Sequence, residues 1–276
     1  MYSKVYVEIT NICNKSCSFC HGHNRPLRQM SASEFELILS KLKKHTEYIY
    51  YHLMGEPLTH PQLCEFVGMA SKKGFKSVIT TNGTLLPNRG AELIKAGVHK
   101  VNISVHSFEG EDNDEYVRYV SGLADFAIRA SQEGVIVVFR FWNKGFDDGK
   151  NELALNVLKL SISGEWINNN RGIKARDNVF VEFADRFEWP DTNASKKGNR
   201  FYCYGLKSHF GILVDGTIVP CCLDSDGIIN LGNIYHDELD DVLRSKRATD
   251  MVEGFKQGKA SEELCAKCGY AQRFVR

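Results

Sequence analysis

Hydrophobic and polar positions alternate along the first two-thirds of the chain in a way that predicts strands and helices in turn. Short apolar runs rich in β-branched or aromatic residues predict strands, and longer stretches with an apolar residue every three to four positions predict amphipathic helices. The predicted strands are residues 5–10, 47–53, 76–80, 98–105, 135–141 and 179–183. The predicted helices are residues 33–44, 63–73, 85–96, 116–133 and 151–162. This alternation predicts an α/β fold whose parallel sheet is open or curled into a partial barrel.

The pattern changes in the last third of the chain. Residues 184–200 contain Trp-Pro-Asp and Lys-Lys-Gly-Asn, which are typical of a linker. Residues 211–219 predict a hairpin with a two-residue turn at Asp215-Gly216, and residues 238–255 predict one helix. A lone hairpin and helix bury little apolar surface, so we expect a bound metal to stabilise this segment. The predicted domains are therefore a core of residues 1–183, a linker of residues 184–200 and a small domain of residues 201–276.

Composition narrows the class of protein. The 276 residues are 43% hydrophobic and 25% charged, which excludes a disordered, collagen-like or coiled-coil chain. Lys and Arg total 35 against 34 Asp and Glu, so the net charge of +1 gives no strong field for nucleic acid or an anionic membrane. No apolar run is long enough to span a bilayer, and the first residues lack the apolar region of a signal peptide. We therefore expect a cytoplasmic protein that binds neither nucleic acid nor membrane.

Eight of the nine cysteines fall into two groups. In a reducing compartment, clustered thiols are more often metal ligands than disulfides. Cys64 lies alone in a predicted helix, where we expect a buried small hydrophobe. The first group is Cys13, Cys17 and Cys20, and the second is Cys203, Cys221, Cys222, Cys265 and Cys268.

The first group follows the first strand directly, at the carboxyl end where α/β folds bind ligands. Three thiolates with the spacing C-x3-C-x2-C can hold three irons of a cubane cluster and leave the fourth iron open for a substrate or cofactor. A zinc ion completed by His21 or His23 is the alternative that the spacing leaves open.

Cys13-x3-Cys17-Ser18-Phe19-Cys20 resembles the signature of the radical S-adenosylmethionine (AdoMet, SAM) enzymes, including the aromatic residue before the third cysteine. Further segments match in the family's order. Gly55-Glu56-Pro57 is similar to the family's GGEP-type motif, with Met54 in place of the first glycine, and Thr81-Asn82-Gly83 is similar to its turn near the cofactor. The resemblance covers residues 1–183 and implies a partial (β/α)6 barrel of the TIM type.

The resemblance also implies roles for individual residues. The three cysteines would hold a [4Fe–4S] cluster with AdoMet on its open iron, Glu56 would bind the AdoMet amino group, and Phe19 would face the adenine. The other implied cofactor-binding residues are Gly55, Pro57, Asn82, Ser104 and Arg140. For Ser104 and Arg140, a structural hydrogen bond within the strands is an equal alternative.

Two further residues are candidates for catalysis. His106 ends a strand beside the cofactor motifs, where its side chain can reach a substrate, and a structural hydrogen bond is the alternative. Asp224 follows the second group of cysteines, where similar enzymes that oxidise their substrates need a base. Acidic residues are also common in turns, so a purely structural Asp224 is the alternative.

The second group of cysteines resembles the SPASM/twitch extension of radical AdoMet enzymes. Gly216-x4-Cys221 and Cys265-x2-Cys268, together with Cys203, imply one auxiliary [4Fe–4S] cluster with four protein ligands, in a hairpin-plus-helix domain. The chain ends eight residues after Cys268, which favours the twitch type. Cys222 is the alternative ligand to Cys221, an iron is open if Cys203 is not a ligand, and zinc held by four thiolates is the alternative metal.

The resemblance implies reductive cleavage of AdoMet to a 5′-deoxyadenosyl radical that takes hydrogen from a substrate carbon. An auxiliary cluster that accepts the second electron makes this a two-electron oxidation. The favoured substrate is a ribosomal peptide that is oxidised, crosslinked or epimerised, with an alcohol oxidised by an aminocyclitol-type dehydrogenase as the alternative. The first strand begins at Val5, which leaves no room for an N-terminal leader-binding domain and counts against the peptide, although a separate protein can bind the leader. The expected partners are therefore a flavodoxin or ferredoxin reductant and, for a peptide substrate, a separate leader-binding protein. The alternative of another class is a non-catalytic metal-binding or electron-transfer protein.

Overall fold

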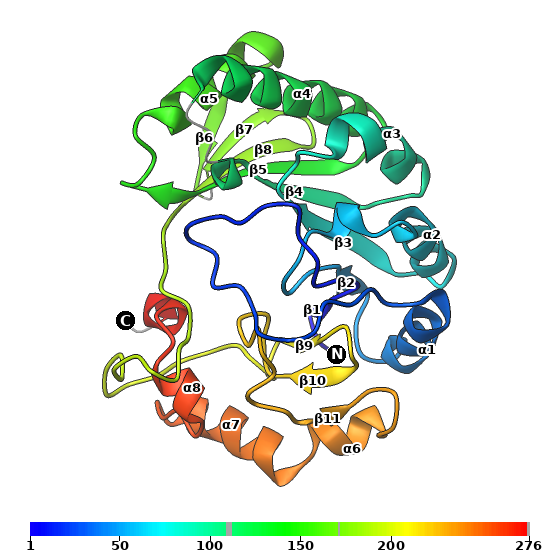
Figure 1. Cartoon of the computed structure of the whole chain (residues 1–276), viewed down its shortest axis with the longest axis vertical. Helices are drawn as coiled ribbons and strands as arrows, with labels where there is room; N and C mark the ends of the chain where they lie inside the picture. The colour runs from blue at the N-terminus through cyan, green and yellow to red at the C-terminus, as the bar shows by residue number, and fades with distance from the viewer. Residues whose placement is uncertain (109–111, 171, 275–276) are drawn as a thin grey trace. The chain divides into compact units, whose positions relative to one another are not determined.

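The computed structural model describes residues 1–108, 112–170 and 172–274, in which strands and helices alternate along the chain (Figure 1). The described chain forms two compact units. The first unit contains residues 1–13, 20–55 and 187–276, and the second contains residues 14–19 and 56–186. Each unit contains parallel strands and helices, as the alternating pattern predicts.

In the first unit, the strand order is β11-β10-β9-β1-β2, with β1 parallel to both β2 and β9. The pairings of β9 with β10 and of β10 with β11 are antiparallel. Val5, Tyr6 and Val7 of β1 are all buried, so this strand is covered on both faces, as is usual for a central strand of a parallel sheet. The strands are β1 (Lys4–Val7), β2 (Tyr48–Tyr50), β9 (His209–Ile212), β10 (Thr217–Val219) and β11 (Gly232–Asn233).

The hairpin between β9 and β10 has a longer turn than expected. The Leu213 N–H donates to the Thr217 carbonyl at 2.9 Å, and the Gly216 N–H donates to the Leu213 carbonyl at 2.8 Å. These bonds enclose the three residues 214–216, so the expected two-residue turn is wrong. Gly216 has a φ of +88°, which suits the left-handed position that ends a three-residue hairpin loop.

The expected single helix at residues 238–255 is also wrong. The chain forms two helices with a break at Arg244-Ser245. The Ser245 hydroxyl accepts a hydrogen bond from the Ala248 N–H at 3.3 Å and caps the second helix, since a serine at this position favours a new helix start. The helical segments of the first unit are α1 (Ala32–Leu42), α6 (Leu239–Leu243), α7 (Lys246–Lys256), α8 (Glu263–Ala266) and the 3-10 helix η3 (Tyr270–Phe274).

In the second unit, the strand order is β3-β4-β5-β8-β7-β6, and the first four strands are parallel. The antiparallel pair β6–β7 was not predicted: the three residues of β6 are all exposed, and Ala175 is the only buried residue of the short strand β7. The strands are β3 (Lys76–Thr81), β4 (Lys100–Ser104), β5 (Ile136–Lys144), β6 (Ile167–Asn169), β7 (Gly172–Arg176) and β8 (Val179–Asp185). The helical segments are η1 (Pro57–Thr59), α2 (Leu63–Lys72), α3 (Leu86–Lys95), η2 (Val105–Ser107), α4 (Asn113–Gln132) and α5 (Lys150–Ser161).

The two faces of this second sheet differ in polarity. Val137, Phe139 and Phe141 share one face of β5 and are fully buried, and helix α4 packs on β5 and β8 (Figure 1). Arg140 lies on the opposite face, because successive side chains of a strand point to opposite sides. The strand register aligns Ser104 with Arg140, and Arg140 with Glu182. The polar face of β4, β5 and β8 therefore carries the side chains available for a site.

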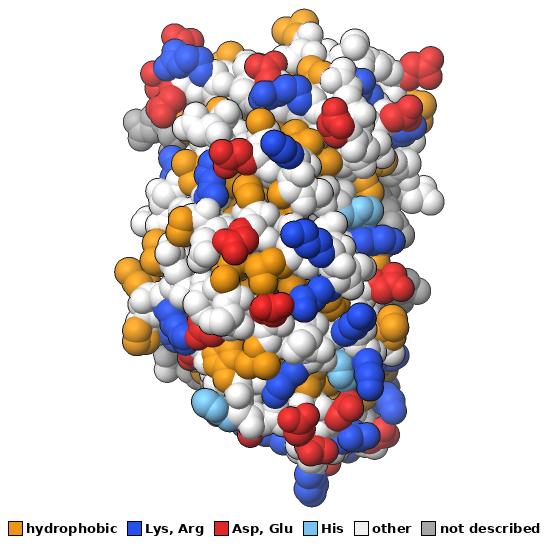
Figure 2. All heavy atoms as spheres, turned by 90° about the vertical axis from the view of Figure 1, so that its right-hand side faces the viewer, with side chains coloured by type: hydrophobic (Ala, Val, Ile, Leu, Met, Phe, Trp, Pro, Cys, Tyr) orange, Lys and Arg blue, Asp and Glu red, His pale blue; other side chains and the backbone are white. Residues whose placement is uncertain are grey.

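The surface carries charges of both signs. Figure 2 shows Lys and Arg side chains interspersed with Asp and Glu side chains on the face that it presents, as expected from a net charge of +1. Among the described residues, no helix combines the length and the apolar character that crossing a bilayer requires.

Candidate functional site

The loop with the first three cysteines follows β1 and is closed at its base. Thr10 and Gln29 form an antiparallel bridge, and the Asn11 side chain donates to the Pro26 carbonyl at 2.8 Å and accepts from the Arg28 N–H at 2.7 Å. The base of the loop is therefore fixed. Within the loop, Cys13 and Cys20 are exposed and Cys17 is half-buried.

The middle of the loop is held at the carboxyl ends of β3 and β4, in the second unit. Asn14 donates to the Thr84 hydroxyl at 3.0 Å and accepts from the Asn82 side chain at 2.9 Å. Cys17 donates to the Ser107 carbonyl at 3.5 Å. The ring of Phe19 lies 5.0 Å from that of His106, between ring centroids. The structure thus brings Cys17, Phe19, Asn82 and His106 together.

Glu56 is the buried carboxylate of this region, with 2% of its surface exposed. It accepts hydrogen bonds from the Leu58 N–H at 3.0 Å and from the Asn82 N–H at 2.7 Å, so it joins the turn after β3 to the start of η1. Burial raises the pKa of Glu56 from 4.5 to about 6, and these hydrogen bonds limit the rise. A buried carboxylate of this kind favours a ligand that donates hydrogen bonds or carries positive charge. Pro57 follows Glu56 as the first residue of η1.

The raised pKa of Glu56 predicts a pH-dependent affinity for AdoMet. A raised pKa means that the unliganded protein favours the neutral acid below about pH 6, whereas an amino group is better accepted by the carboxylate. We expect AdoMet to bind about fourfold more tightly at about pH 7.5 than at about pH 5.5 because of this ionisation. Calorimetric titration of the reconstituted protein measures the effect. In Glu56→Gln, binding should be weaker and this fourfold component should be missing; an identical pH profile in the variant would contradict the assignment.

Gly55 allows the backbone to approach the cysteine loop closely within the first unit. Its φ is +74°, and a Cβ on it would collide with the Thr10 carbonyl oxygen and lie 2.9 Å from the Asn11 Cα. We expect Gly55→Ala to lower the free energy of unfolding by more than about 1 kcal/mol, measured by urea denaturation. Gly74→Ala is the control, because Gly74 has a φ of +85° and a Cβ added to it would meet no atom within 4 Å. Equal losses in both variants would show that the close approach is unimportant.

Ser104, Arg140 and His106 cluster at the carboxyl ends of β4 and β5. Arg140 Nε lies 3.6 Å from a Glu182 carboxylate oxygen, and its guanidinium lies 4.8 Å from the centre of the Trp142 ring. His106 Nδ1 lies 3.0 Å from the Arg140 carbonyl oxygen. The structure therefore places Arg140 in an ion pair with Glu182, and a methionine carboxylate would have to share the guanidinium with that residue.

Asn102 is a residue of this region that the sequence analysis did not select. It is completely buried on β4, its amide nitrogen donates to the Thr80 hydroxyl at 3.2 Å, and its Oδ1 has no hydrogen-bond partner among the described residues. A buried polar atom without a partner is costly, so it marks a place where a ligand can supply a donor. The signal in the sequence was an amide inside an otherwise apolar strand.

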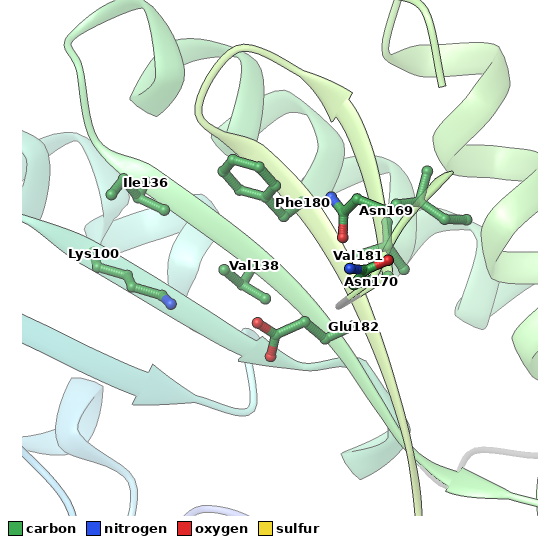
Figure 3. Close-up of a pocket in the computed structure, with 10 residues that line it drawn as sticks. Lys100, Ile136, Val138, Asn169, Asn170, Phe180, Val181 and Glu182 are labelled. Carbon is green, nitrogen blue, oxygen red and sulfur yellow. The ribbon is translucent and has the colours of Figure 1, made fainter. Parts of the chain in front are cut away.

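A cavity of about 590 Å³ opens on the second unit's sheet. Its floor is apolar, with Ile136, Val138 and Phe180 from β5 and β8. Figure 3 shows the Lys100 amine and the Glu182 carboxylate extending toward one another above Val138. The cavity therefore combines an apolar floor with one group of each charge, and the β6–β7 pair adds the amides of Asn169 and Asn170.

The second group of cysteines converges in the first unit. Burial raises the pKa of Cys221 well above its usual range, and the negative charges of Cys222, Cys203 and Cys265 raise it further. Burial likewise raises the pKa of Cys265 well above its usual range, and the negative charges of Cys203 and Cys268 raise it further. Such mutual effects arise only between neighbouring thiols. Cys222 also shares a side-chain hydrogen bond with Tyr6, which leaves Cys221 as the better candidate for a ligand.

Asp224 lies next to these cysteines and is almost completely buried. Its two carboxylate oxygens accept hydrogen bonds from the Ile228 N–H at 2.9 Å and the Ile229 N–H at 2.8 Å. Burial raises its pKa, and these bonds oppose the rise. The carboxylate thus holds the loop after Cys222, and its role as a base stays a prediction.

The donor sets fit iron–sulfur clusters. Thiols are the usual ligands of [4Fe–4S] clusters, and the chain offers three on one loop and a separate convergent group. Within the described ranges, no three His, Cys, Asp or Glu side chains are close enough to hold a single metal ion.

Comparison with protein families finds two matches. The Radical SAM superfamily matches residues 7–132, and an iron–sulfur cluster-binding domain of the SPASM type matches residues 203–269. A probable GTP 3′,8-cyclase of Sulfolobus acidocaldarius is 33% identical over 262 residues, which cover 83% of each chain. A probable GTP 3′,8-cyclase of Methanocaldococcus jannaschii is 29% identical over 161 residues, and a Fe-coproporphyrin III synthase of Methanosarcina barkeri is 29% identical over 141 residues. The match to the M. jannaschii cyclase covers 57% of this chain and 50% of the relative. The match to the M. barkeri synthase covers 48% of this chain and 35% of the relative. This chain therefore spans about half or less of the length of these two relatives.

Solved structures share the fold. BtrN in complex with AdoMet and 2-DOIA has a TM-score of 0.64 at 18% identity, covering 97% of this chain and 93% of that chain. Streptococcus suis SuiB bound to its precursor peptide SuiA has a TM-score of 0.55 at 15% identity, and the match covers 99% of this chain and 70% of that chain. The fold is thus an open α/β sheet consistent with a partial barrel, followed by a small cluster-binding extension. The chain belongs to the radical SAM superfamily, in its SPASM/twitch subgroup, whose cofactors are AdoMet, a [4Fe–4S] cluster and an auxiliary cluster.

Proposed function

We propose that this radical SAM enzyme is an oxidoreductase that removes hydrogen from a carbon atom of a ribosomal peptide, with oxidation, crosslinking or epimerisation as the outcome. The observation that carries the proposal is the buried Glu56, bonded to the Asn82 N–H at 2.7 Å, beside the segment that carries Cys17 and Phe19. This arrangement supports AdoMet binding at the carboxyl ends of β3 and β4, where parallel α/β folds hold their ligands.

Each residue of the site would have a separate role. When bound, the cluster and AdoMet supply a 5′-deoxyadenosyl radical that abstracts hydrogen from the substrate. Cys13, Cys17 and Cys20 would hold the cluster, Glu56 would accept the AdoMet amino group, and the Phe19 ring would cover the adenine. His106 would face the substrate from η2.

The second group of cysteines provides a route for the second electron. Cys203, Cys221, Cys265 and Cys268 would saturate the auxiliary cluster, so electron acceptance suits it better than binding the substrate. Asp224 would be the candidate base that takes the proton of the substrate, while the bound groups would supply the acceptors for the hydrogen atom and the second electron. A flavodoxin or ferredoxin would supply the first electron, and a separate protein would bind the peptide leader.

Two observations bear on the substrate. The peptide is supported by the likeness to SuiB bound to its precursor peptide. The second candidate is oxidation of a small alcohol, favoured by the likeness to BtrN over 97% of this chain.

Product analysis separates these candidates. The reconstituted enzyme would be incubated without oxygen with AdoMet, dithionite and a synthetic peptide encoded by a short reading frame beside its gene. We expect 5′-deoxyadenosine together with a peptide that has lost two hydrogen atoms, or that has gained solvent deuterium at an inverted centre. Glu56→Gln is the comparison and should form little of either product. Oxidation of an aminocyclitol with no change in the peptide would favour the second candidate.

A further inference from the structure

Glu8 is a charged residue at the centre of the first unit, completely buried. One of its carboxylate oxygens accepts hydrogen bonds from the Met54 N–H at 3.1 Å and from Arg25 at 2.7 Å. The other accepts from the Val214 N–H at 3.0 Å and from Arg25 at 2.8 Å. A single side chain that follows β1 therefore binds the segment before Gly55, the loop after Cys20 and the β9–β10 hairpin.

Arg25 extends this network to the segment that follows the second group of cysteines. Its Nε donates to the Ser225 carbonyl oxygen at 2.7 Å, while its two terminal nitrogens form the fork on Glu8. The adjacent residue adds a second connection, because the Asn24 N–H donates to an Asp226 carboxylate oxygen at 2.6 Å. Hydrogen bonds thus join residues 24–25 to residues 225–226.

Hydrophobic stabilisation alone does not explain a buried ion pair at this place. An apolar pair of similar volume often stabilises a protein as much or more, because burying two charges is costly. The Glu8–Arg25 pair supplies what apolar side chains lack, namely directional bonds to backbone groups of separate segments at once. Two of the segments that the pair joins follow the cysteines of the two groups, at Cys20 and at Cys222.

We propose that Glu8 and Arg25 are positioning residues that hold the loop after Cys20 and the loop after Cys222 in one fixed arrangement. This inference rests on the proposed function in one respect, since it assigns the pair the task of keeping the two clusters at a constant separation for electron transfer. Neither side chain touches the substrate or AdoMet in this proposal. Their effect is exerted through the backbone that carries the cluster ligands.

The test uses the conservative variants Arg25→Lys and Glu8→Gln, which keep size while removing the fork or the charge. In the doubly loaded, reduced protein, pulsed dipolar EPR measures the distribution of distances between the two clusters. We expect a narrow distribution in the unaltered protein and a clearly broader one in both variants. Hydrogen exchange should also rise about tenfold at the amides of Met54 and Val214, which lose a fixed acceptor.

Arg247→Lys is the matched control. Arg247 forms the same forked pair with Glu262, at 2.7 and 2.8 Å, and also donates to the Asn230 carbonyl, so it ties together only segments of the C-terminal part. The control should leave the cluster distance and the two amides unchanged. A narrow distribution in Arg25→Lys, or equal broadening in Arg247→Lys, would overturn the proposal, since the pair would then be no more than one structural contact among others.

The two proposals fail in different experiments. Exchange at Met54 and Val214 is read on the metal-free chain as well, and the EPR measurement needs reduced clusters but no turnover. An unmodified peptide in the product assay would refute the proposed substrate without affecting these readouts. Unchanged exchange and distances in an enzyme that does modify the peptide would refute the positioning role alone.

Discussion

A chain in which Cys13, Cys17 and Cys20 are all replaced by alanine is expected to retain about four of the about eight irons of the unaltered protein after anaerobic reconstitution. It should also form no 5′-deoxyadenosine from AdoMet, because the cluster with the open iron is lost while the separate thiol group of the first unit remains. Iron and sulfide analysis, with mass spectrometry of the nucleoside product, measures both effects. This is the largest change in activity that the site predicts.

Cys64→Ala is the control for this experiment. Cys64 lies on α2, apart from both cysteine groups in the sequence, and is half-buried rather than buried as expected; burial raises the pKa of its thiol. The control should keep about eight irons and full cleavage of AdoMet. About four irons in the unaltered protein, all lost in the triple variant, would remove the auxiliary electron acceptor. Zinc in place of iron would contradict the assignment of both clusters.

The largest expected loss of stability comes from Arg25→Met. This change leaves the Glu8 carboxylate completely buried without its counter-charge, a situation that typically costs about 3–5 kcal/mol. We expect a loss of that size in the free energy of unfolding, measured by urea denaturation of the metal-free, reduced chain. The double variant Glu8→Gln/Arg25→Met should recover much of it, because no unpaired charge remains buried.

Arg247→Met supplies the comparison for stability. Its pair with Glu262 is partly exposed, with 45% of the Arg247 side chain and 19% of the Glu262 side chain accessible, and ion pairs at the surface contribute about 0–1 kcal/mol. If Arg25→Met costs no more than Arg247→Met, Glu8 must be reached by water in solution and the buried network does not stabilise the fold.

The sequence predicted the fold well where local patterns and burial agree. The apolar runs at residues 76–80 and 135–141 became β3 and β5, and the amphipathic stretch at residues 63–73 became α2. Predictions failed where one residue outweighed periodicity. Ser245 divided the helix expected at residues 238–255, and the positive φ of Gly216 gave a three-residue loop. The β6–β7 pair is short and all of β6 is exposed, so only the pairing of β7 with β8 revealed it.

Some features of the candidate site could likewise be predicted from local sequence, and others could not. The cysteine spacing and the Gly55-Glu56-Pro57 segment identified the cofactors, because a cluster and AdoMet require particular ligands at short separations along the chain. The burial of Glu56 and the ion pair between Arg140 and Glu182 depend on neighbours far away in the sequence. The same holds for the Asn102 oxygen, which meets no hydrogen-bond donor in the described part of the chain. No local pattern specifies such surroundings.

The sequence by itself determined the superfamily chemistry of this protein, since thiol number and spacing fix which metal groups can bind. It also determined the order of strands and helices, because hydrophobic periodicity is a local property. Only the tertiary structure decided how Glu8 binds Arg25, 17 positions away, and how Arg25 binds the Ser225 carbonyl, 200 positions away. Such contacts depend on how the strands pair, and a buried charge reveals its role only when all its partners are in place.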